Sequence, residues 1–138
     1  MIKRFAYCMG FLSTLCQPVS AADGELGIEL NKLEPAEAAC RAYLVFENRT
    51  QTEYRSLKLD LVMFGNDGVI IKRLAVEGGP LAKDKTSVKL FEITDVTCDR
   101  IGRVLMNDVI SCEDAMGARQ NCADEVVTSS RSAVSFFK

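Results

Sequence analysis

Apolar and polar residues alternate with a period of two over short runs of this chain, and this alternation restricts the fold more than any other feature. Successive side chains of an extended strand point to opposite faces of a sheet, so a strand with one buried face has this period. The clearest run is YRSLKLDLVMF, residues 54–64. One of its faces carries Leu57, Leu59, Leu61 and Met63, and the other carries Lys58, Asp60, Val62 and Phe64.

Similar runs recur between turn residues and predict further strands: LGIELN (26–31), CRAYLVFE (40–47), GVIIKRLAV (68–76), VKLFEI (88–93), RVLMNDVISC (103–112) and the tail SRSAVSFFK (130–138). EPAEAA should end the first strand, and residues 113–120 could form a single helical turn. Six to eight short strands predict an all-β protein, an immunoglobulin-like β-sandwich of about seven short antiparallel strands. A small β-barrel is the alternative. Within residues 103–112 the alternation assigns one face to Val104, Met106, Ile110 and Cys112.

The N-terminus has the pattern of an export signal. Lys3 and Arg4 precede an apolar stretch over residues 5–15, which is shorter than the ~20 residues that span a bilayer. Small residues follow Pro18, so we expect cleavage after Ala21 or Ala22. This predicts a signal peptide over residues 1–21 and one exported domain over 22–138, in the periplasm, with no stable membrane insertion. A lipid anchor on Cys16 and a retained N-terminal anchor are the alternatives.

Four cysteines remain after cleavage, which in a small exported chain indicates two disulfides. Three pairings are possible, and strand directions favour one of them. The second and sixth predicted strands run the same way, so Cys40 and Cys98 lie at the same end of the sandwich. Cys112 lies at the other end of the sixth strand, near Cys122. The predicted bridges are therefore Cys40–Cys98 and Cys112–Cys122, with a thiol-redox or metal-handling role as the alternative.

Several kinds of chemistry are disfavoured by composition. The chain has no histidine, which removes the usual general base near neutral pH. Its formal net charge is −2 and becomes about −4 without Lys3 and Arg4, so nucleic acid is a poor partner. We therefore predict no catalytic, cofactor-binding or metal-binding residues and no cofactor. A small envelope hydrolase remains an alternative, with Asp95, Asp99 and Asp108 as candidate carboxylates.

Two short motifs have a local structural interpretation. GNDG between two apolar runs resembles a calcium loop, but Gly68 at its central position would put Met63 and Leu74 at ligand positions. Asn and Gly tolerate positive φ, so a hairpin corner is the favoured interpretation. NRT, residues 48–50, is a formal glycosylation acceptor of the eukaryotic secretory pathway.

Apolar residues also occur at positions that alternation assigns to the outside of the sandwich. Large exposed apolar patches mark partner surfaces. The candidates for such a surface are Tyr43, Val45, Val62 and Phe64, with Phe91 and Ile93 also assigned to the outside. In the alternative, the tail covers them with Val134, Phe136 and Phe137. The favoured function is a non-enzymatic periplasmic binding or accessory module that contacts an envelope protein.

Three segments together, CRAYLVFENRT, SLKLDLVMFGNDGVIIKRLAVE and VKLFEITDVTCDRIGRVLMNDVISC, carry a resemblance to a known group. The chain resembles small exported proteins of Gram-negative, alphaproteobacterial genomes that are labelled as Tat-pathway signal-sequence domain proteins. The resemblance covers most of the exported part and implies a periplasmic location without a mechanism. Lys3-Arg4 departs from a twin arginine and favours the general secretion route.

Overall fold

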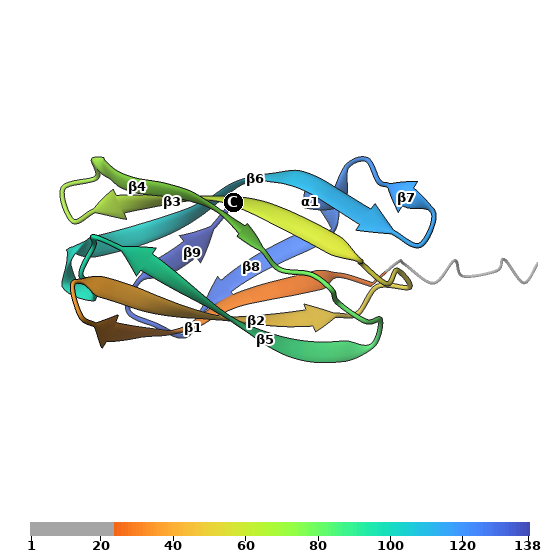
Figure 1. Ribbon diagram of the computed structural model, residues 1–138, viewed down its shortest axis with the longest axis horizontal. Coiled ribbons are helices and arrows are strands. Elements are labelled where there is room, and N and C mark those ends of the chain that lie inside the picture. The colour runs from red at the N-terminus through yellow and green to blue at the C-terminus, as the bar shows by residue number, and fades with distance from the viewer. Residues whose placement is uncertain (1–23) are drawn as a thin grey trace, which may run out of the picture.

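The computed structural model describes residues 24–138, which form two β-sheets packed face to face (Figure 1). The predicted signal peptide over residues 1–21 lies outside the described residues. The elements are β1 (Leu26–Ala36), β2 (Ala39–Asn48), β3 (Ser56–Gly65), β4 (Ile70–Glu77), β5 (Lys85–Thr94), η1 (Cys98–Arg100), β6 (Ile101–Asp114), β7 (Gly117–Ala118), α1 (Cys122–Glu125), β8 (Val126–Ser130) and β9 (Ser135–Phe137).

One sheet has the strand order β5-β2-β1-β8, and the other has the order β4-β3-β6-β7 with β9 also paired to β6. The chain crosses between the sheets after β2, β4, β5, β7 and β8, so many neighbours in sequence lie in different layers. Strands β1, β2 and β5 correspond to strands A, B and E of an immunoglobulin-like sandwich, and β3 and β6 correspond to strands C and F. The predicted all-β sandwich is confirmed, and the described residues form no closed barrel.

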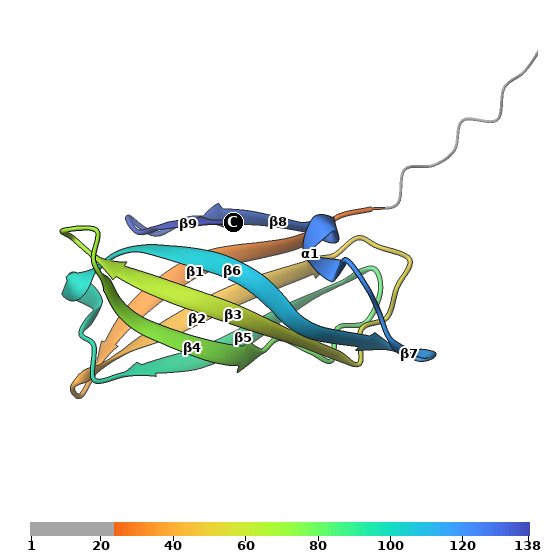
Figure 2. The ribbon, with the colours of Figure 1, turned by 90° about the horizontal axis from the view of Figure 1, so that it is seen from above.

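The C-terminal part departs from the predicted antiparallel pattern. β8 pairs in parallel with β1, and after a reversal of the chain β9 pairs in parallel with β6. Figure 2 shows these two short strands together along one side of the sandwich. β8, with the sequence VVTSS, was not predicted because a short, largely polar strand has little alternation. The helical turn predicted over residues 113–120 is wrong, since this segment turns at Gly117 (φ 113°) and pairs as β7.

The first strand continues through the predicted break as far as Ala36. A register shift between Leu30 and Lys32 marks an irregularity in its pairing with β2. Proline lacks a backbone N–H and is tolerated where no neighbour needs that donor. Pro35 meets this condition because β8 pairs only with the first five residues of β1 and leaves this part of the strand without a second neighbour.

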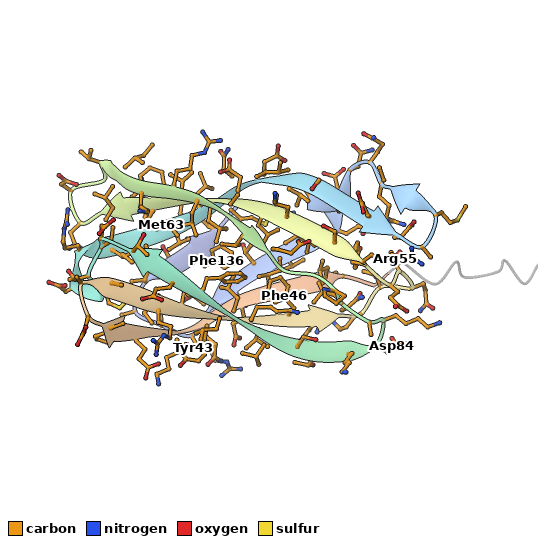
Figure 3. All side chains as sticks on the ribbon, in the orientation of Figure 1. Tyr43, Phe46, Arg55, Met63, Asp84 and Phe136 are labelled. Carbon is orange, nitrogen blue, oxygen red and sulfur yellow. A yellow bond between two sulfur atoms is a disulfide. The ribbon has the colours of Figure 1, made fainter. Side chains whose placement is uncertain are left out.

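The core lies between the sheets and is built from the alternating positions. Figure 3 shows Phe46, Met63 and Phe136 in this layer, while Tyr43 points away from it. The four residues predicted on the inner face of β3 are all buried: Leu57, Leu59, Leu61 and Met63. The alternation of YRSLKLDLVMF therefore predicted the buried face correctly.

Two face assignments are wrong. Ile110 is 52% exposed, and Val109 packs against the core in its place. Register shifts opposite Lys58–Leu59 and Asp60–Leu61 give β6 extra residues, and each extra residue reverses the alternation. Ile93 and Phe91 face the core rather than the outside, because both faces of VKLFEI are apolar and its alternation has no unique phase.

Both predicted cysteine pairs are confirmed as disulfides. Cys40 at the start of β2 is bonded to Cys98 in η1, with 4.8 Å between their Cα atoms. This bridge joins the two sheets at one end. Cys112 near the end of β6 is bonded to Cys122 at the start of α1, with 6.6 Å between their Cα atoms. It fixes the chain where it leaves the five-stranded sheet.

The GNDG segment forms the corner of the β3–β4 hairpin, as predicted. The backbone N–H of Gly65 donates to the carbonyl of Val69 at 2.7 Å, and that of Gly68 donates to Gly65 at 2.9 Å. Gly68 has φ of 81°, and Asp67 accepts a bond from the backbone N–H of Val69. Its aspartate therefore stabilises the turn. Among the described residues, no helix is long and apolar enough to cross a membrane.

Candidate partner-binding surface

The four predicted surface residues lie on two opposite faces of the molecule. Tyr43 and Val45 point outward from β2 in the four-stranded sheet, whereas Val62 and Phe64 point outward from β3 in the other sheet. The sandwich core separates the two pairs. They therefore cannot form one patch, and each face has to be considered by itself.

On the outer face of the five-stranded sheet, the two predicted residues Val62 and Phe64 are covered. Val62 is only 6% exposed and Phe64 is half-buried. The guanidinium of Arg103 lies over the Phe64 ring at 4.6 Å and over the Phe137 ring at 5.5 Å. The tail contributes to this cover through Phe137, while Phe136 enters the core and Val134 packs against it. Ile70 and Ile110 remain exposed on this sheet, but Ile70 pairs with Phe64 and Ile110 lies opposite Lys58–Leu59, so they are near opposite ends of β3.

The outer face of the five-stranded sheet also carries a buried carboxylate, that of Asp60. Asp60 points outward from β3, but Nε and Nη2 of Arg73 donate to it at 2.8 and 2.7 Å. Nδ2 of Asn107 donates to the same carboxylate at 2.7 Å. These hydrogen bonds, those from Arg73 first, hold the pKa of Asp60 below its usual range. The cluster links β3, β4 and β6.

The outer face of the four-stranded sheet is different, because its apolar residues are exposed. Val88 and Leu90 on β5 are 62% and 52% exposed. They pair directly with Val45 and Tyr43, respectively, so the four side chains adjoin across β2 and β5. We call these four residues the β2–β5 patch. Sequence reasoning found its β2 half and missed Val88 and Leu90, because it assigned the wrong face of VKLFEI to the core.

Neighbouring charges fix the orientation of Tyr43 in this patch. Its hydroxyl donates to Glu34 at 2.5 Å, and Nζ of Lys32 lies 5.4 Å from its ring centroid. Lys32 and Glu34 also form an ion pair at 3.6 Å. The hydroxyl of Tyr43, then Lys32, lower the pKa of Glu34 from its ordinary value. An aromatic ring held in this way loses little conformational entropy when it binds a partner.

A groove of about 220 Å³ continues the patch across β1 toward β8. Gly27 forms its floor, because it has no side chain between Val45 and Glu47 on one side and Val127 on the other. Arg49 reaches over this floor and pairs with Glu47 at 3.2 Å. A Cβ atom at Gly27 would lie 3.5 Å from Nη2 of Arg49, an ordinary van der Waals contact, so the guanidinium lies directly over this position.

One edge strand of each sheet, β5 and β4, is protected against pairing with another strand. Inward-pointing charges on edge strands serve this purpose in natural proteins. Lys89 on β5 lies opposite the core residue Leu44, and Lys72 on β4 lies opposite Met63, so each lysine belongs to an inner face. Nζ of Lys72 donates to Oγ1 of Thr94 at 3.3 Å. A partner is consequently expected on a side-chain face rather than along these edges.

A polar cluster braces the end of the sandwich near the second disulfide. Tyr54 is fully buried, and its hydroxyl donates to Glu125. Burial, and then the bond to Glu125, raises the pKa of Tyr54 to about 12. Arg119 donates to Asp114 at 3.2 Å and to Glu125 at 2.8 Å, with its guanidinium 5.8 Å from the Tyr54 ring. The cluster ties the segment that precedes β3 to the end of β6 and to α1.

The NRT motif has a structural role in the folded chain. Asn48 is 1% exposed, and its Nδ2 donates to the carbonyls of Thr52 at 2.8 Å and Ala82 at 3.2 Å. Its Oδ1 accepts from the hydroxyl of Thr50 at 2.7 Å. The side-chain amide that would carry a glycan is therefore buried, and both its nitrogen and its oxygen form hydrogen bonds.

The three candidate carboxylates lie on different elements and are all exposed. Asp95 follows β5 with φ of 62°, Asp99 lies in η1, and Asp108 lies in β6, where its Oδ1 accepts from the N–H of Val109. Across residues 24–138, no group of three or more cysteine, aspartate or glutamate side chains is placed to hold a metal ion. The β2–β5 patch is the best-defined candidate site.

Comparison with known proteins adds no family: no protein-family model matches the chain, and no match is found among curated proteins or among solved structures.

Proposed function

We propose that the protein is a non-enzymatic binding module of the periplasm that contacts a protein partner through the outer face of its four-stranded sheet. The observation that carries the proposal is the β2–β5 patch, where Val88 and Leu90 are more than half exposed beside Tyr43 and Val45. Exposed contiguous apolar surface is costly for a monomer and indicates a binding surface.

Two further features support this proposal. On the opposite face Arg103 covers Phe64, and the exposed Ile70 and Ile110 lie near opposite ends of β3 rather than at paired positions. Two disulfides and the fixed Tyr43 make the surface rigid, which lowers the entropic cost of binding. The apolar leader sequence and the paired cysteines support an exported location.

Site-specific photocrosslinking in the native envelope tests the proposal. A photoreactive amino acid at Val88 should give a discrete crosslinked species that mass spectrometry can identify. The matched control is Ala75 on β4, an exposed position on the opposite face. Val88→Asp should prevent co-purification of the identified protein and leave the melting temperature nearly unchanged, because an exposed side chain contributes little to folding. Equal crosslinking at both positions, or none at Val88, would contradict the proposal.

A further inference from the structure

The outward side chains of the four-stranded sheet form rows across β1, β2 and β5, because directly paired residues point to the same face. The centre of the arrangement lies between Tyr43 and Val45 on β2. From one end of the face to the other, the rows are Glu34, Arg41 and Glu92; then Lys32, Tyr43 and Leu90; then Glu29, Val45 and Val88; then Gly27, Glu47 and Thr86.

This pattern is complementary to itself. A second copy can be turned by 180° about an axis that lies in the plane of the face, perpendicular to the strands. Each strand then lies on its own counterpart in the reverse direction. The second row meets the third row of the other copy, and the first row meets the fourth. We propose that the β2–β5 patch binds a second copy of this chain in this two-fold arrangement, an inference that rests on the proposed binding function.

The central rows supply apolar contacts. Tyr43 would lie against Val45 of the partner subunit, and Leu90 would lie against Val88 of the partner subunit. Because the axis repeats each contact, all four residues of the patch are covered in both copies. Sheets packed face to face align within about 30° of each other, so these central rows remain in contact despite the twist of the strands.

The charged positions are matched in the same arrangement. Arg41 would face Glu47 of the partner subunit, and Lys32 would face Glu29 of the partner subunit. Within residues 24–138, Arg41 has no carboxylate oxygen within ion-pairing distance in its own chain. No two like charges are opposed. Complementary charge of this kind fixes orientation and register more than it adds affinity.

The groove over Gly27 adds a complementary shape. In the two-fold arrangement the first row meets the fourth, so Glu34 of one copy lies over Gly27 of the other. The groove there has a volume of about 220 Å³, and its charged lining consists of Glu29, Glu47 and Arg49. Arg49, which pairs with Glu47 at 3.2 Å, is the cation that the incoming carboxylate would meet. Because Gly27 has no side chain, the incoming Glu34 would approach the Arg49 guanidinium that lies over this position.

The expected dimer is weak. Four strands ~4.8 Å apart and seven residues at ~3.3 Å each give a face of roughly 19 Å by 23 Å. The area of this face, which is the product of the two lengths, is below the ~800 Å² that each partner buries in an interface of standard size. We expect a dissociation constant in the micromolar range, and we expect dimerisation by this face rather than by the lysine-protected edge of β5.

Charge reversal tests the arrangement, with sedimentation velocity of the mature protein over a wide concentration range. Arg41→Glu and Glu47→Arg should each weaken dimerisation about ten-fold or more. The double variant restores opposite charges across the axis and should regain most of the wild-type association. Leu90→Asp, at a position 52% exposed, should abolish the dimer without altering the fold. Lys58→Glu on the opposite face is the matched control and should leave association unchanged.

A wild-type protein that is monomeric up to roughly millimolar concentration would overturn the inference. Failure of the double reversal to restore association, with circular dichroism showing a native fold, would also overturn it. These results leave the proposed function standing if Val88 still crosslinks to a different envelope protein. Absence of any crosslink at Val88 in a protein that dimerises would instead exclude Val88 from the dimer contact and contradict both proposals.

Discussion

Asp60 shows how one residue can tie three strands together on an outward-facing surface. Its side chain is 6% exposed, whereas that of its partner Arg73 is 66% exposed, so the cation screens the carboxylate from water. Replacing Asp60 by Asn would remove the charge-assisted bonds and leave part of the Arg73 fork without an acceptor. We expect Asp60→Asn to lower the free energy of unfolding by about 1–2 kcal/mol. Urea denaturation at pH 7 measures this loss, and Asp108→Asn at an exposed position is the matched control.

The same residue predicts a dependence of stability on pH. The pKa of Asp60 is lowered by folding from an unfolded value of ~3.9. Its stabilising effect is therefore complete above that unfolded value and is lost as the pH falls through the folded pKa. The unfolding free energy of Asp60→Asn should consequently fall less than that of the wild type between pH ~5 and pH ~2. Parallel curves for the two proteins over this interval would show that Asp60 has no such role.

The alternation of apolar and polar residues predicted which side chains of β3 are buried. It did not predict which outward-facing apolar side chains remain accessible to a partner. Val62 and Phe64 looked equivalent to Tyr43 and Val45, since all four occupy outward positions. Arg103, which is 39 residues after Phe64 in the sequence, covers the Phe64 ring. Such a long-range contact leaves no periodic signal in the chain. The sequence therefore pointed to Tyr43 and Val45 in the β2–β5 patch but could not show that Val62 and Phe64 are covered.

At the scale of elements, the two lysines on the edge strands make a prediction about association. Lys72 and Lys89 put charge on the inner faces of β4 and β5, where an added strand would have to bury it. Lys89→Val should give the 10-residue strand β5 an unprotected apolar edge and lead to higher oligomers or aggregates. Light scattering over time measures this, with Lys83→Val in the preceding loop as the control. A variant that stays as dispersed as the control would remove the protective role.

The two disulfides should differ in their contribution to stability. Cys40 and Cys98 are separated by 58 positions in sequence, whereas Cys112 and Cys122 are separated by 10. A bridge that closes a longer loop restricts the unfolded chain more, which gives about 4 kcal/mol for the first and about 3 kcal/mol for the second. Paired Cys→Ser variants measured by denaturant unfolding should follow this order. The reverse order would show that local braces such as Arg119 depend on the second bridge.

Prediction of elements succeeded where one face of a strand is apolar and failed where that condition does not hold. Both faces of VKLFEI carry apolar residues. Only the structure shows that Phe91 and Ile93 face the core and that Val88 and Leu90 face outward. Extra residues in β6 reverse the alternation and expose Ile110. VVTSS forms β8 because β1 offers it a free edge, which is a tertiary condition. The failure at VKLFEI is an ambiguity within the segment, whereas those at β6 and β8 have their causes in the neighbouring strands.

At the scale of the whole molecule, strand order and cysteine position were enough to predict both bridges. Four reversals of direction between the second and sixth strands place Cys40 and Cys98 at one end, and the structure confirms this placement. What the sequence could not give is the division of the strands between two sheets. That division separates Tyr43 from Phe64 and brings Val88 and Leu90 beside Val45 and Tyr43, so the candidate site could only be completed from the structure.

The fold also predicts the redox state of the four cysteines in the exported protein. If the leader directs the chain to an oxidising compartment, all four remaining cysteines should be bonded, since each lies beside its partner in the fold. Alkylation of periplasmic material before reduction should label none of them, and alkylation after reduction in denaturant should label four. Protein retained in the cytoplasm by deletion of residues 1–21 is the control and should be labelled without reductant. Free thiols in the mature periplasmic form would contradict both the export and the structural role of the bridges.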